Sequence, residues 1–408
     1  MRRDHYMIFS EGRIGTLTVA NRLVRSATWD PSILTKRRMT DDVLGIYRQV
    51  AAGGVGLIIT GDFSVIPEGL FRQGQSAEGV ISYQDVRIEG FDRLVEVVRS
   101  AAPSCRILAQ VSGEYPGVGP SNIPSPYTRE GVRPLSIGEI RTIAECFAVA
   151  IAGVKSDGFA GVQLHAAHGG LLSRFLSPYT NRRSDQYGGS LENRVRIVRE
   201  IVSSAREHVA DYPILIKMNC TDYVPGGIDI HSFPELARQV ERCGVDAIEI
   251  SGGMWDCLIR SEAELGFRPV PAPESHTRIH SPGQQSYFLE YAEQLDLGIP
   301  VILVGGNRDV ERLEAVLRQG KVDFVAMCRP LISEPDLPSR WLEGRGSSGT
   351  DCISCNSCIY DMRVHVGKGE PWVATCLIKH DPARVRAAQH WLSTWVERNT
   401  IEHRSTRT

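Results

Sequence analysis

The chain has 408 residues, of which 46 are Lys or Arg and 48 are Asp or Glu, so its formal charge is −2. With 42% apolar and 23% charged residues it has the composition of a globular protein, and its near-neutral charge provides no broad basic surface for nucleic acid. No stretch approaches the roughly 20 apolar residues of a membrane span, and the amino-terminal segment lacks the apolar core of a secretory signal, so we expect a cytoplasmic protein that binds neither nucleic acid nor membrane.

Short runs rich in β-branched and other apolar residues recur along the chain, and segments with helical spacing lie between them. Strict alternation of strand and helix favours an all-parallel sheet, and eight such units favour closure into a (β/α)8 TIM barrel. An open, doubly wound sheet is the alternative. Helical segments begin near Phe91, Ser136, Ser190 and Ser232, and the three serines are placed to cap a first turn. The expected strands are Leu23–Ser26, Val55–Thr60, Ile107–Val111, Gly161–His165, Ile214–Met218, Ala247–Ser251, Val301–Val304 and Phe324–Met327.

Two loops in this pattern are long enough to be lids or binding loops. Gly113–Pro134 follows the third expected strand, and Gly252–Gly283 follows the sixth. In a barrel the functional residues lie on such loops, at the carboxyl ends of the strands. We expect the barrel to span residues 1–345, followed by a small cysteine-rich extension, 346–398, and a disordered tail, 399–408.

Two histidines close the fourth expected strand in the segment HAAH, with two alanines between them. His165 and His168 can both donate hydrogen bonds to one oxygen atom, which polarises a carbonyl or a phenolate. Metal binding is the alternative, although no carboxylate follows at the spacing of a metal ligand. The segment therefore predicts an oxygen-binding pair at the barrel mouth.

The last two strands end in residues typical of a phosphate site. Gly305 and Gly306 precede a helix and let backbone N–H groups approach an anion, and Arg329 adds a charge after the next strand. A tight turn is the alternative for the glycine pair. Lys217 lies within the apolar run ILIKMN, and if it points into the barrel it needs an anionic partner, which a cofactor could supply. The alternative is an outward side chain that reaches solvent.

Four of the ten cysteines crowd the carboxyl-terminal part: Cys352, Cys355, Cys358 and, after seventeen residues, Cys376. Three thiols at successive two-residue intervals favour an iron–sulfur cluster, which we expect to be [4Fe–4S], over a zinc ribbon, whose ligands form two separate pairs. A thiol-rich loop without metal is the third interpretation.

Motifs in matching order over about residues 8–345 resemble the old yellow enzyme family of FMN-dependent NADH:flavin oxidoreductases, and more closely its 2,4-dienoyl-CoA reductase and trimethylamine dehydrogenase branch. They are NRLVRSAT, GLIIT, LAQV, HAAHG, FLSP, NRRSDQYGGSLENR, IKMN, VGG and RPLISEPDLP. The resemblance implies FMN over the barrel mouth, NAD(P)H as electron donor, and hydride transfer from flavin N5 to an activated C=C bond of a small-molecule substrate. It implies Ser26, Ala27 and Thr28 along the isoalloxazine, Gln110 at its pyrimidine edge, Lys217 beside N1, Gly305, Gly306, Cys328 and Arg329 at the phosphate, and His165 and His168 at the substrate oxygen.

The chain also departs from that family. Gly170 stands where most members have a tyrosine that donates a proton, and Tyr115 and Tyr179 are alternative acids. Asp62 brings a charge to the second strand, where smaller residues are common. No GxGxxG follows a strand, so electrons for a cluster would come from NAD(P)H at FMN or from a partner protein, and a second copy of the chain is another expected partner.

These departures leave three alternatives to an ene-reductase. One is a flavin-dependent dehydrogenase or demethylase of the same family. Another is a non-redox, phosphate-binding barrel such as an aldolase. The last is an electron-transfer subunit with little substrate chemistry of its own.

Overall fold

The structure, a computed structural model, describes residues 2–29, 39–65, 90–113, 117–124, 132–270, 272–368 and 374–405. Eight parallel strands form a closed barrel in chain order, which confirms the predicted (β/α)8 fold and rules out the open sheet. The strands are β3 (Leu23–Arg25), β4 (Leu57–Ser64), β5 (Arg106–Ser112), β8 (Gly161–Ala166), β9 (Ile214–Thr221), β10 (Ala247–Gly252), β11 (Val301–Leu303) and β12 (Phe324–Met327).

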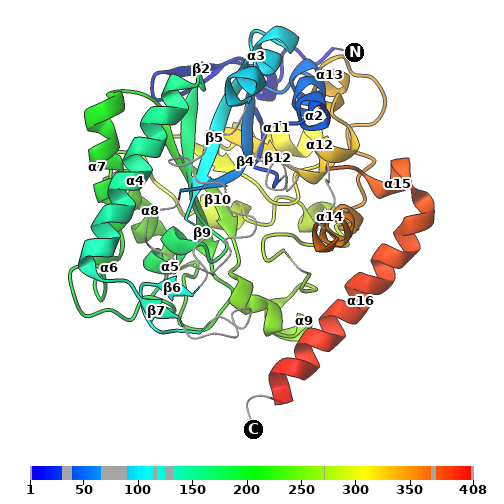
Figure 1. The fold of residues 1–408 in the computed structure, drawn as a ribbon. Coiled ribbons are helices and arrows are strands. Elements are labelled where there is room, and N and C mark those ends of the chain that lie inside the picture. The colour runs from blue at the N-terminus through cyan, green and yellow to red at the C-terminus, as the bar shows by residue number, and fades with distance from the viewer. Residues whose placement is uncertain are drawn as a thin grey trace.

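Helices surround the barrel (Figure 1). Ser136 begins the longest of the surrounding helices with a capping box, in which its hydroxyl accepts from the backbone N–H of Glu139 and the Glu139 side chain accepts from the backbone N–H of Ser136. Ser190 likewise caps a short helix, but Ser232 does not act as predicted, because its hydroxyl donates to Asp229 instead. The helices are α2 (Asp41–Ala52), α3 (Phe91–Ala101), α4 (Ile137–Ser156), α6 (Leu191–Arg194), α7 (Arg196–Val209), α8 (Phe233–Glu241), α11 (Val310–Arg318) and α13 (Leu337–Leu342).

A small hairpin closes the amino end of the barrel, and the sequence did not predict it. Its strands, β1 (Gly12–Ile14) and β2 (Leu17–Val19), have only three residues each, which is too short for a period-two pattern to stand out. Ile14 and Val19 are fully buried and belong to the same apolar cluster as residues inside the barrel. The hairpin therefore seals the lower end of the barrel and leaves the other end for the site.

Inward-facing side chains change from apolar to polar along the strands. The lower layer is apolar and includes Leu57, Leu108 and Leu215. Two residues further along β5 and β9, the inward positions hold Gln110 and Lys217, because successive side chains of a strand alternate between its faces. The polar layers thus lie toward the carboxyl ends, where TIM barrels hold their active sites.

Short elements are built into the loops at the mouth. Both long loops contain them, and none extends beyond six residues. They are β6 (Val118–Gly119), β7 (Arg133–Pro134), α5 (Leu171–Leu176), η2 (Trp255–Ile259), α9 (Glu262–Leu265), η3 (Pro282–Gln284), α10 (Leu289–Ala292) and α12 (Arg329–Ser333); a further short helix, η1 (Met7–Phe9), precedes the amino-terminal hairpin.

The carboxyl-terminal extension consists of α14 (Ser357–Gly367), α15 (Leu377–His380) and α16 (Pro382–Ser405). The long α16 runs beside the barrel toward α9 (Figure 1) and contacts η2. It is helical as far as Ser405, whereas the sequence predicted a disordered tail from residue 399; no Gly or Pro follows Pro382 to interrupt it. The predicted domain limits remain a prediction.

Among the described residues, no helix has both the length and the apolar character that crossing a bilayer requires.

Candidate functional site

The centre of the barrel holds a buried ion pair. The Nζ atom of Lys217 lies 3.1 Å from Oε1 of Glu249, and the two side chains are 6% and 0% exposed. These residues are direct neighbours in the β9–β10 register, so the sheet itself brings them together. Lys217 therefore points inward as the sequence predicted, but its anionic partner is a carboxylate of the chain, which the sequence analysis missed.

A hydrogen-bonded network extends from this ion pair across the barrel. Ser26 Oγ donates to Glu249 Oε1 at 2.5 Å and accepts from Lys217 Nζ at 2.9 Å. Gln163 Nε2 donates to Glu249 Oε2 at 2.7 Å, and Gln110 Nε2 donates to Gln163 Oε1 at 2.6 Å. All five side chains are buried, so each polar group needs these partners. The network joins three predicted cofactor residues to two that were not predicted.

The two histidines lie together at the mouth, beside the network. Their ring centroids are 5.1 Å apart, and His165 neighbours Lys217 in the β8–β9 register. His168 has a left-handed backbone with φ 59°, its N–H donates to Asn219 Oδ1 at 3.1 Å, and its Nε2 lies 2.7 Å from Ser251 Oγ. Nδ1 of His165 is buried without a hydrogen-bond partner among the described residues. Such an atom costs about 1–3 kcal/mol unless a ligand satisfies it.

Burial keeps these imidazoles neutral. Desolvation lowers the pKa of His165 to about 4, against a small opposing effect of Asp62, and lowers the pKa of His168 well below its ordinary value. A third histidine, His276, has its pKa lowered to about 3 by burial and by the charge of Arg329. At neutral pH each ring can therefore donate one N–H without carrying a charge.

These shifts predict a stability that falls on acidification. Below a pH of about 6.5 the unfolded chain binds protons at these histidines, whereas the folded chain does not. The stabilisation of the folded state by these neutral histidines is therefore complete above that pH and is lost as the pH falls toward 4. Because the rings are only partly shielded from water, we expect the free energy of unfolding to drop by about 2–4 kcal/mol between pH 7 and pH 5 in urea titrations.

His276→Phe provides the matched control for this pH dependence. The ring stacks between Phe267 and Tyr287, at centroid distances of 3.8 and 3.9 Å, and its Nε2 has no partner among the described residues, so a phenyl ring fits the position. The variant should lose less stability between pH 7 and pH 5 than the parent chain. An equal loss in both proteins would contradict the assignment of His276 as one of the titrating groups.

The predicted phosphate residues meet at the ends of β11 and β12. Gly305 and Gly306 have φ values of 107° and 74°, and a Cβ atom on Gly305 would lie 2.7 Å from the Tyr287 ring, so only glycine fits there. Arg329 donates through Nη1 to the carbonyl of His276 at 2.8 Å and to Asn356 Oδ1 at 2.6 Å. Both acceptors are neutral, which leaves this cation without an anionic partner among the described residues.

The loop after β10 lies across these residues. Tyr287 Oη donates to the Glu274 carbonyl at 2.7 Å, which fixes the loop against the glycine pair. Burial raises the pKa of the Glu274 carboxyl group, and the nearby charges of Lys217 and Arg329 oppose that rise. The Gly252–Gly283 loop thus contacts Arg329 through the His276 carbonyl, and its role as a binding loop stays a prediction.

The remaining predicted flavin residues lie at the ends of β3, β4 and β12. Thr28 Oγ1 is 3.2 Å from Cys328 Sγ, so the ends of β3 and β12 touch at the mouth, with Ala27 packed against the inner apolar cluster. Asp62, which departs from the family pattern, accepts from Ser112 Oγ at 2.8 Å. The carboxylate therefore does reach the mouth, near His165.

Gly170, which stands in place of the family's tyrosine, immediately precedes α5 and has no side chain that could donate a proton. Its neighbour Gly169 faces Trp255, because a Cβ atom there would lie 3.5 Å from that ring. Of the two alternative acids, Tyr115 lies outside the described residues. Tyr179 donates its backbone N–H to Ser177 Oγ at 3.2 Å, and its carbonyl accepts from Arg182 Nε at 3.1 Å. A carboxyl group that was not predicted, Asp256, has its pKa raised to about 6 by burial.

The cysteine segment, residues 352–358, is fastened to the barrel by two arginines. Arg308 donates through Nη2 to the Cys352 carbonyl and through Nη1 to Ser354 Oγ, and Arg329 donates to Asn356. Burial raises the pKa of the Cys352 and Cys358 thiols, and Arg329 opposes the rise. Within the described part of the chain, no three Cys, His, Asp or Glu side chains are arranged to hold a metal. The structure therefore gives no support to the predicted cluster at Cys352, Cys355, Cys358 and Cys376, which stays a prediction.

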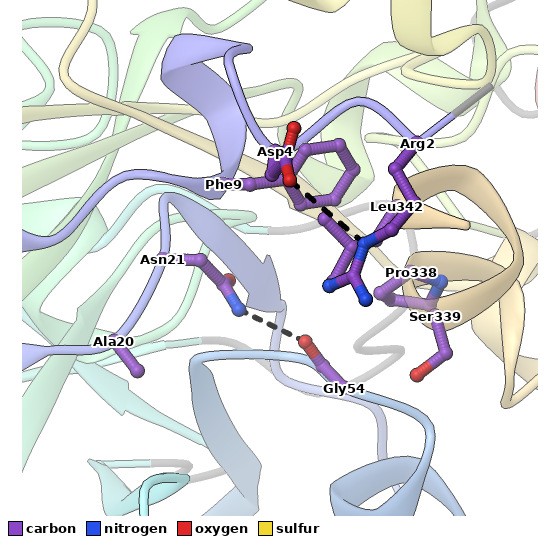
Figure 2. A pocket seen from close by; sticks show the side chains of 9 residues that line it. All are labelled: Arg2, Asp4, Phe9, Ala20, Asn21, Gly54, Pro338, Ser339 and Leu342. Atoms are coloured by element: carbon purple, nitrogen blue, oxygen red, sulfur yellow. Dashed lines mark hydrogen bonds and ion pairs between the residues drawn. The ribbon is translucent and has the colours of Figure 1, made fainter. Parts of the chain in front are cut away.

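A hollow of about 290 Å³ lies at the amino end of the barrel (Figure 2). Its lining includes Asn21, whose Nδ2 donates to the Gly54 carbonyl at 2.9 Å, and the exposed pair Arg2 and Asp4, 3.9 Å apart. Residues at this end of a TIM barrel usually serve stability and not catalysis. We assign the hollow no chemistry.

A family comparison decides the relationship. The sequence model of the NADH:flavin oxidoreductase / NADH oxidase family matches residues 7–347. The chain belongs to this family. The match covers the whole barrel, and it confirms the resemblance that the motifs indicated.

Individual relatives agree with this assignment. The chain is 33% identical over 390 residues to a metal reductase of Desulforamulus reducens, covering 93% of this chain and 54% of that protein. It is 33% identical over 364 residues to an NADH oxidase of Thermoanaerobacter brockii, covering 86% and 53%. An NADPH dehydrogenase of Geobacillus thermodenitrificans is 31% identical over 343 residues, covering 81% and 92%. The chain thus spans about half the length of the first two relatives.

Solved structures share the fold. A 2-naphthoyl-CoA reductase bound to 2-naphthoyl-CoA superposes with a TM-score of 0.76 and 25% identity, covering 94% of this chain and 58% of that one. An old yellow enzyme homologue from Zymomonas mobilis gives a TM-score of 0.65 at 22% identity, covering 84% and 94%. The second likeness supports the barrel fold alone.

Proposed function

We propose that the protein is an FMN-dependent oxidoreductase that takes electrons from NAD(P)H and reduces a C=C bond conjugated to a carbonyl group. The observation that carries the proposal is the pair of neutral histidines, His165 and His168, of which His165 is the direct β8–β9 neighbour of the buried Lys217. Family membership and the NADH oxidase and NADPH dehydrogenase relatives support the choice of flavin and nicotinamide. We also keep the cytoplasmic location as a prediction.

The residues at the mouth fit FMN. The unpartnered Nδ1 of His165, the two left-handed glycines, and the Arg329 cation with neutral partners are all groups that a polar, anionic ligand would satisfy. Arg329, Cys328 and the glycine pair would hold its phosphate, and Ser26, Ala27, Thr28, Gln110 and Lys217 would hold its ring. Once reduced by NAD(P)H, bound FMN would supply a hydride at N5.

The histidines act on the substrate oxygen. Each neutral imidazole donates one N–H, and a carbonyl oxygen between rings 5.1 Å apart can accept from both. As the β carbon gains a hydride, negative charge develops on that oxygen, and fixed donors in a desolvated site stabilise it. The bond between His168 and Ser251 and the αL backbone of His168 hold this ring in place before the substrate arrives.

Protonation of the α carbon needs a different group from that of most relatives, because Gly170 carries no phenol. Asp256, with a pKa raised to about 6, and water are candidate sources beside Tyr115 and Tyr179. The same glycine favours a second candidate, dehydrogenation or demethylation of a substrate by the flavin, since those reactions require no proton for carbon.

The experiment that tests the proposal starts from the purified chain reconstituted with FMN. We expect absorption bands near about 370 and 450 nm, bleached by NADH or NADPH, and faster reoxidation when an α,β-unsaturated ketone or thioester is added. The second candidate would be favoured if NAD(P)H bleaches the flavin, no alkene reoxidises it, and an amine or a saturated acyl substrate reduces the oxidised flavin. A chain that binds no FMN would contradict both.

The histidine pair gives a separate prediction. His165→Ala and His168→Ala should each weaken binding of a phenolic ligand such as p-hydroxybenzaldehyde by about tenfold, because each removes one hydrogen bond to a charged oxygen, while FMN stays bound. The charge-transfer absorbance between phenolate and flavin measures the affinity. His208→Ala, on the outer helix α7, is the matched control. Unchanged affinity in both site variants would remove the oxygen-binding role.

We propose further that Cys352, Cys355, Cys358 and Cys376 bind a [4Fe–4S] cluster when iron is available. The supporting observation is the spacing, and loading would have to draw the thiols together. Anaerobically purified protein should contain about four iron and four sulfide per chain, and Cys355→Ser should lose them. Zinc instead of iron, or no metal, would contradict the proposal. The electron donor of such a cluster would be reduced FMN, a partner protein or a second copy of the chain.

A further inference from the structure

The phosphate-binding end of the barrel and the cysteine segment share one guanidinium group. Arg329 Nη1 donates to two oxygens from different parts of the chain, the carbonyl of His276 in the β10 loop and Oδ1 of Asn356 in the cysteine segment. Its Nε and Nη2 make no hydrogen bond to any described residue, and neither is sealed from solvent. One edge of the guanidinium is therefore fixed, and the other is open toward the mouth.

Asn356 is built rigidly into this position. Its side chain is 1% exposed, its φ of 58° is a left-handed conformation that Asn adopts more readily than most residues, and its carbonyl accepts from the N–H of Ile359 in the first turn of α14. The amide orientation is determined, because a guanidinium only donates and the partner atom must be Oδ1. Nδ2 is buried and has no partner among the described residues. The chain thus tolerates an unsatisfied donor in order to present one oxygen to Arg329.

The choice of an amide here has an electrostatic consequence. A carboxylate at 2.6 Å would hold the guanidinium equally well but would neutralise it, and an anionic ligand would then meet an ion pair instead of a free cation. An amide oxygen orients Arg329 and leaves its charge intact. The carbonyl of His276 has the same property.

We propose that Asn356 is a positioning residue for cofactor selection, holding Arg329 in the orientation and charge state that bind the FMN phosphate. The cysteine segment thereby contributes to flavin recognition through an amide side chain. This inference rests on the proposed function, because it presumes that FMN is the ligand of the mouth. The proposal predicts that Asn356 affects the affinity for FMN and not the affinity for riboflavin, which has the same ring system and no phosphate.

Asn356→Asp tests the proposal with almost no change in shape. Asp is the same size, tolerates the left-handed backbone and keeps the oxygen, so a purely structural role predicts wild-type behaviour. If Asn356 maintains the charge of Arg329, the affinity for FMN falls by about tenfold or more, while the affinity for riboflavin stays within about twofold of wild type. Quenching of flavin fluorescence on titration with the flavin-free chain measures both affinities without any turnover.

Two further variants complete the test. Asn356→Gly removes the side chain and keeps the αL backbone, and it should also lower FMN affinity by about tenfold with riboflavin unchanged, which keeps the proposal testable if the Asp variant fails to fold. Ser354→Ala is the matched control from the same segment, since Ser354 accepts at 3.1 Å from Arg308 and not from Arg329. It should bind both flavins as wild type does.

The outcomes separate this inference from the proposed function. Equal loss of FMN and riboflavin in the Asn356 variants, or equal loss in Ser354→Ala, would show that general loosening of the segment is responsible and would overturn the proposal. Wild-type FMN binding by Asn356→Asp would overturn it while leaving the proposed function intact. A parent chain that binds neither flavin would overturn both.

Discussion

Replacing Lys217 with Met should lower the free energy of unfolding by about 3–5 kcal/mol, measured by urea titration of the flavin-free chain. The substitution keeps the length of the side chain but leaves Glu249, which is 0% exposed, without its cation. Ser26 and Gln163 still donate to this carboxylate, yet two neutral donors do not offset the desolvation of a charge. The loss comes from the uncompensated carboxylate, and not from the lost contact alone.

A double variant distinguishes this cause from simple mispacking. Lys217→Met combined with Glu249→Gln removes both charges while Gln keeps one oxygen for Ser26 or Gln163, so most of the lost stability should return. If the double variant is as unstable as Lys217→Met, the cost lies in packing and the electrostatic account is wrong. Lys155→Met on α4 serves as a surface control, because its Nζ donates to the Val209 carbonyl and lies over the Tyr212 ring, away from any buried carboxylate.

The barrel was predictable because each of its strands carries a local signal. Runs such as Ile214–Met218 and Ala247–Ser251 are apolar on the outer face and end within two or three residues of the observed limits. The amino-terminal hairpin gave no such signal, since its strands are three residues long and bury one or two side chains each. The break of the predicted Ser190 helix into α6 and α7 at Val195 likewise depends on tertiary packing.

The candidate site was only partly predictable, for a related reason. Lys217, His165 and His168 stand out as polar residues within apolar strand runs. Glu249 and Gln163 have the same pattern but were overlooked. In AIEIS and GVQLH the polar residue occupies the inward position of an alternating pattern. Comparing inward positions on adjacent strands would have paired Glu249 with Lys217, because both lie two residues after the apolar lower layer.

Contacts between distant loops could not be derived. The stack of Phe267, His276 and Tyr287 and the bond from Arg329 to Asn356 join residues that no periodicity relates. Loop conformation depends on which carbonyl or ring happens to lie within reach once the barrel has formed. Spacing alone therefore identified the cysteine segment as chemically unusual but gave no indication that it fastens the phosphate-binding arginine.

Replacing Arg329 with Ala should weaken FMN binding by about 100-fold or more and leave riboflavin binding nearly unchanged. The guanidinium is the cation at the end of β12, and its unbonded Nε and Nη2 form the planar fork that suits a phosphate. Two charge-assisted hydrogen bonds of about 1.5–3 kcal/mol each account for the expected loss. Arg329→Lys keeps the charge and loses the fork, so its FMN affinity should lie between those of the parent chain and Arg329→Ala.

Stability must be separated from recognition in this experiment, because Arg329→Ala also leaves Asn356 Oδ1 and the His276 carbonyl without their donor. The melting temperature of the flavin-free variant measures that cost, and the ratio of FMN to riboflavin affinity cancels it, since both ligands bind the same folded chain. A ratio unchanged from the parent chain would mean that the phosphate lies elsewhere and that Arg329 only fastens the β10 loop to the cysteine segment. A ratio that collapses toward one would place the phosphate at the end of β12, where the glycine pair and Arg329 converge.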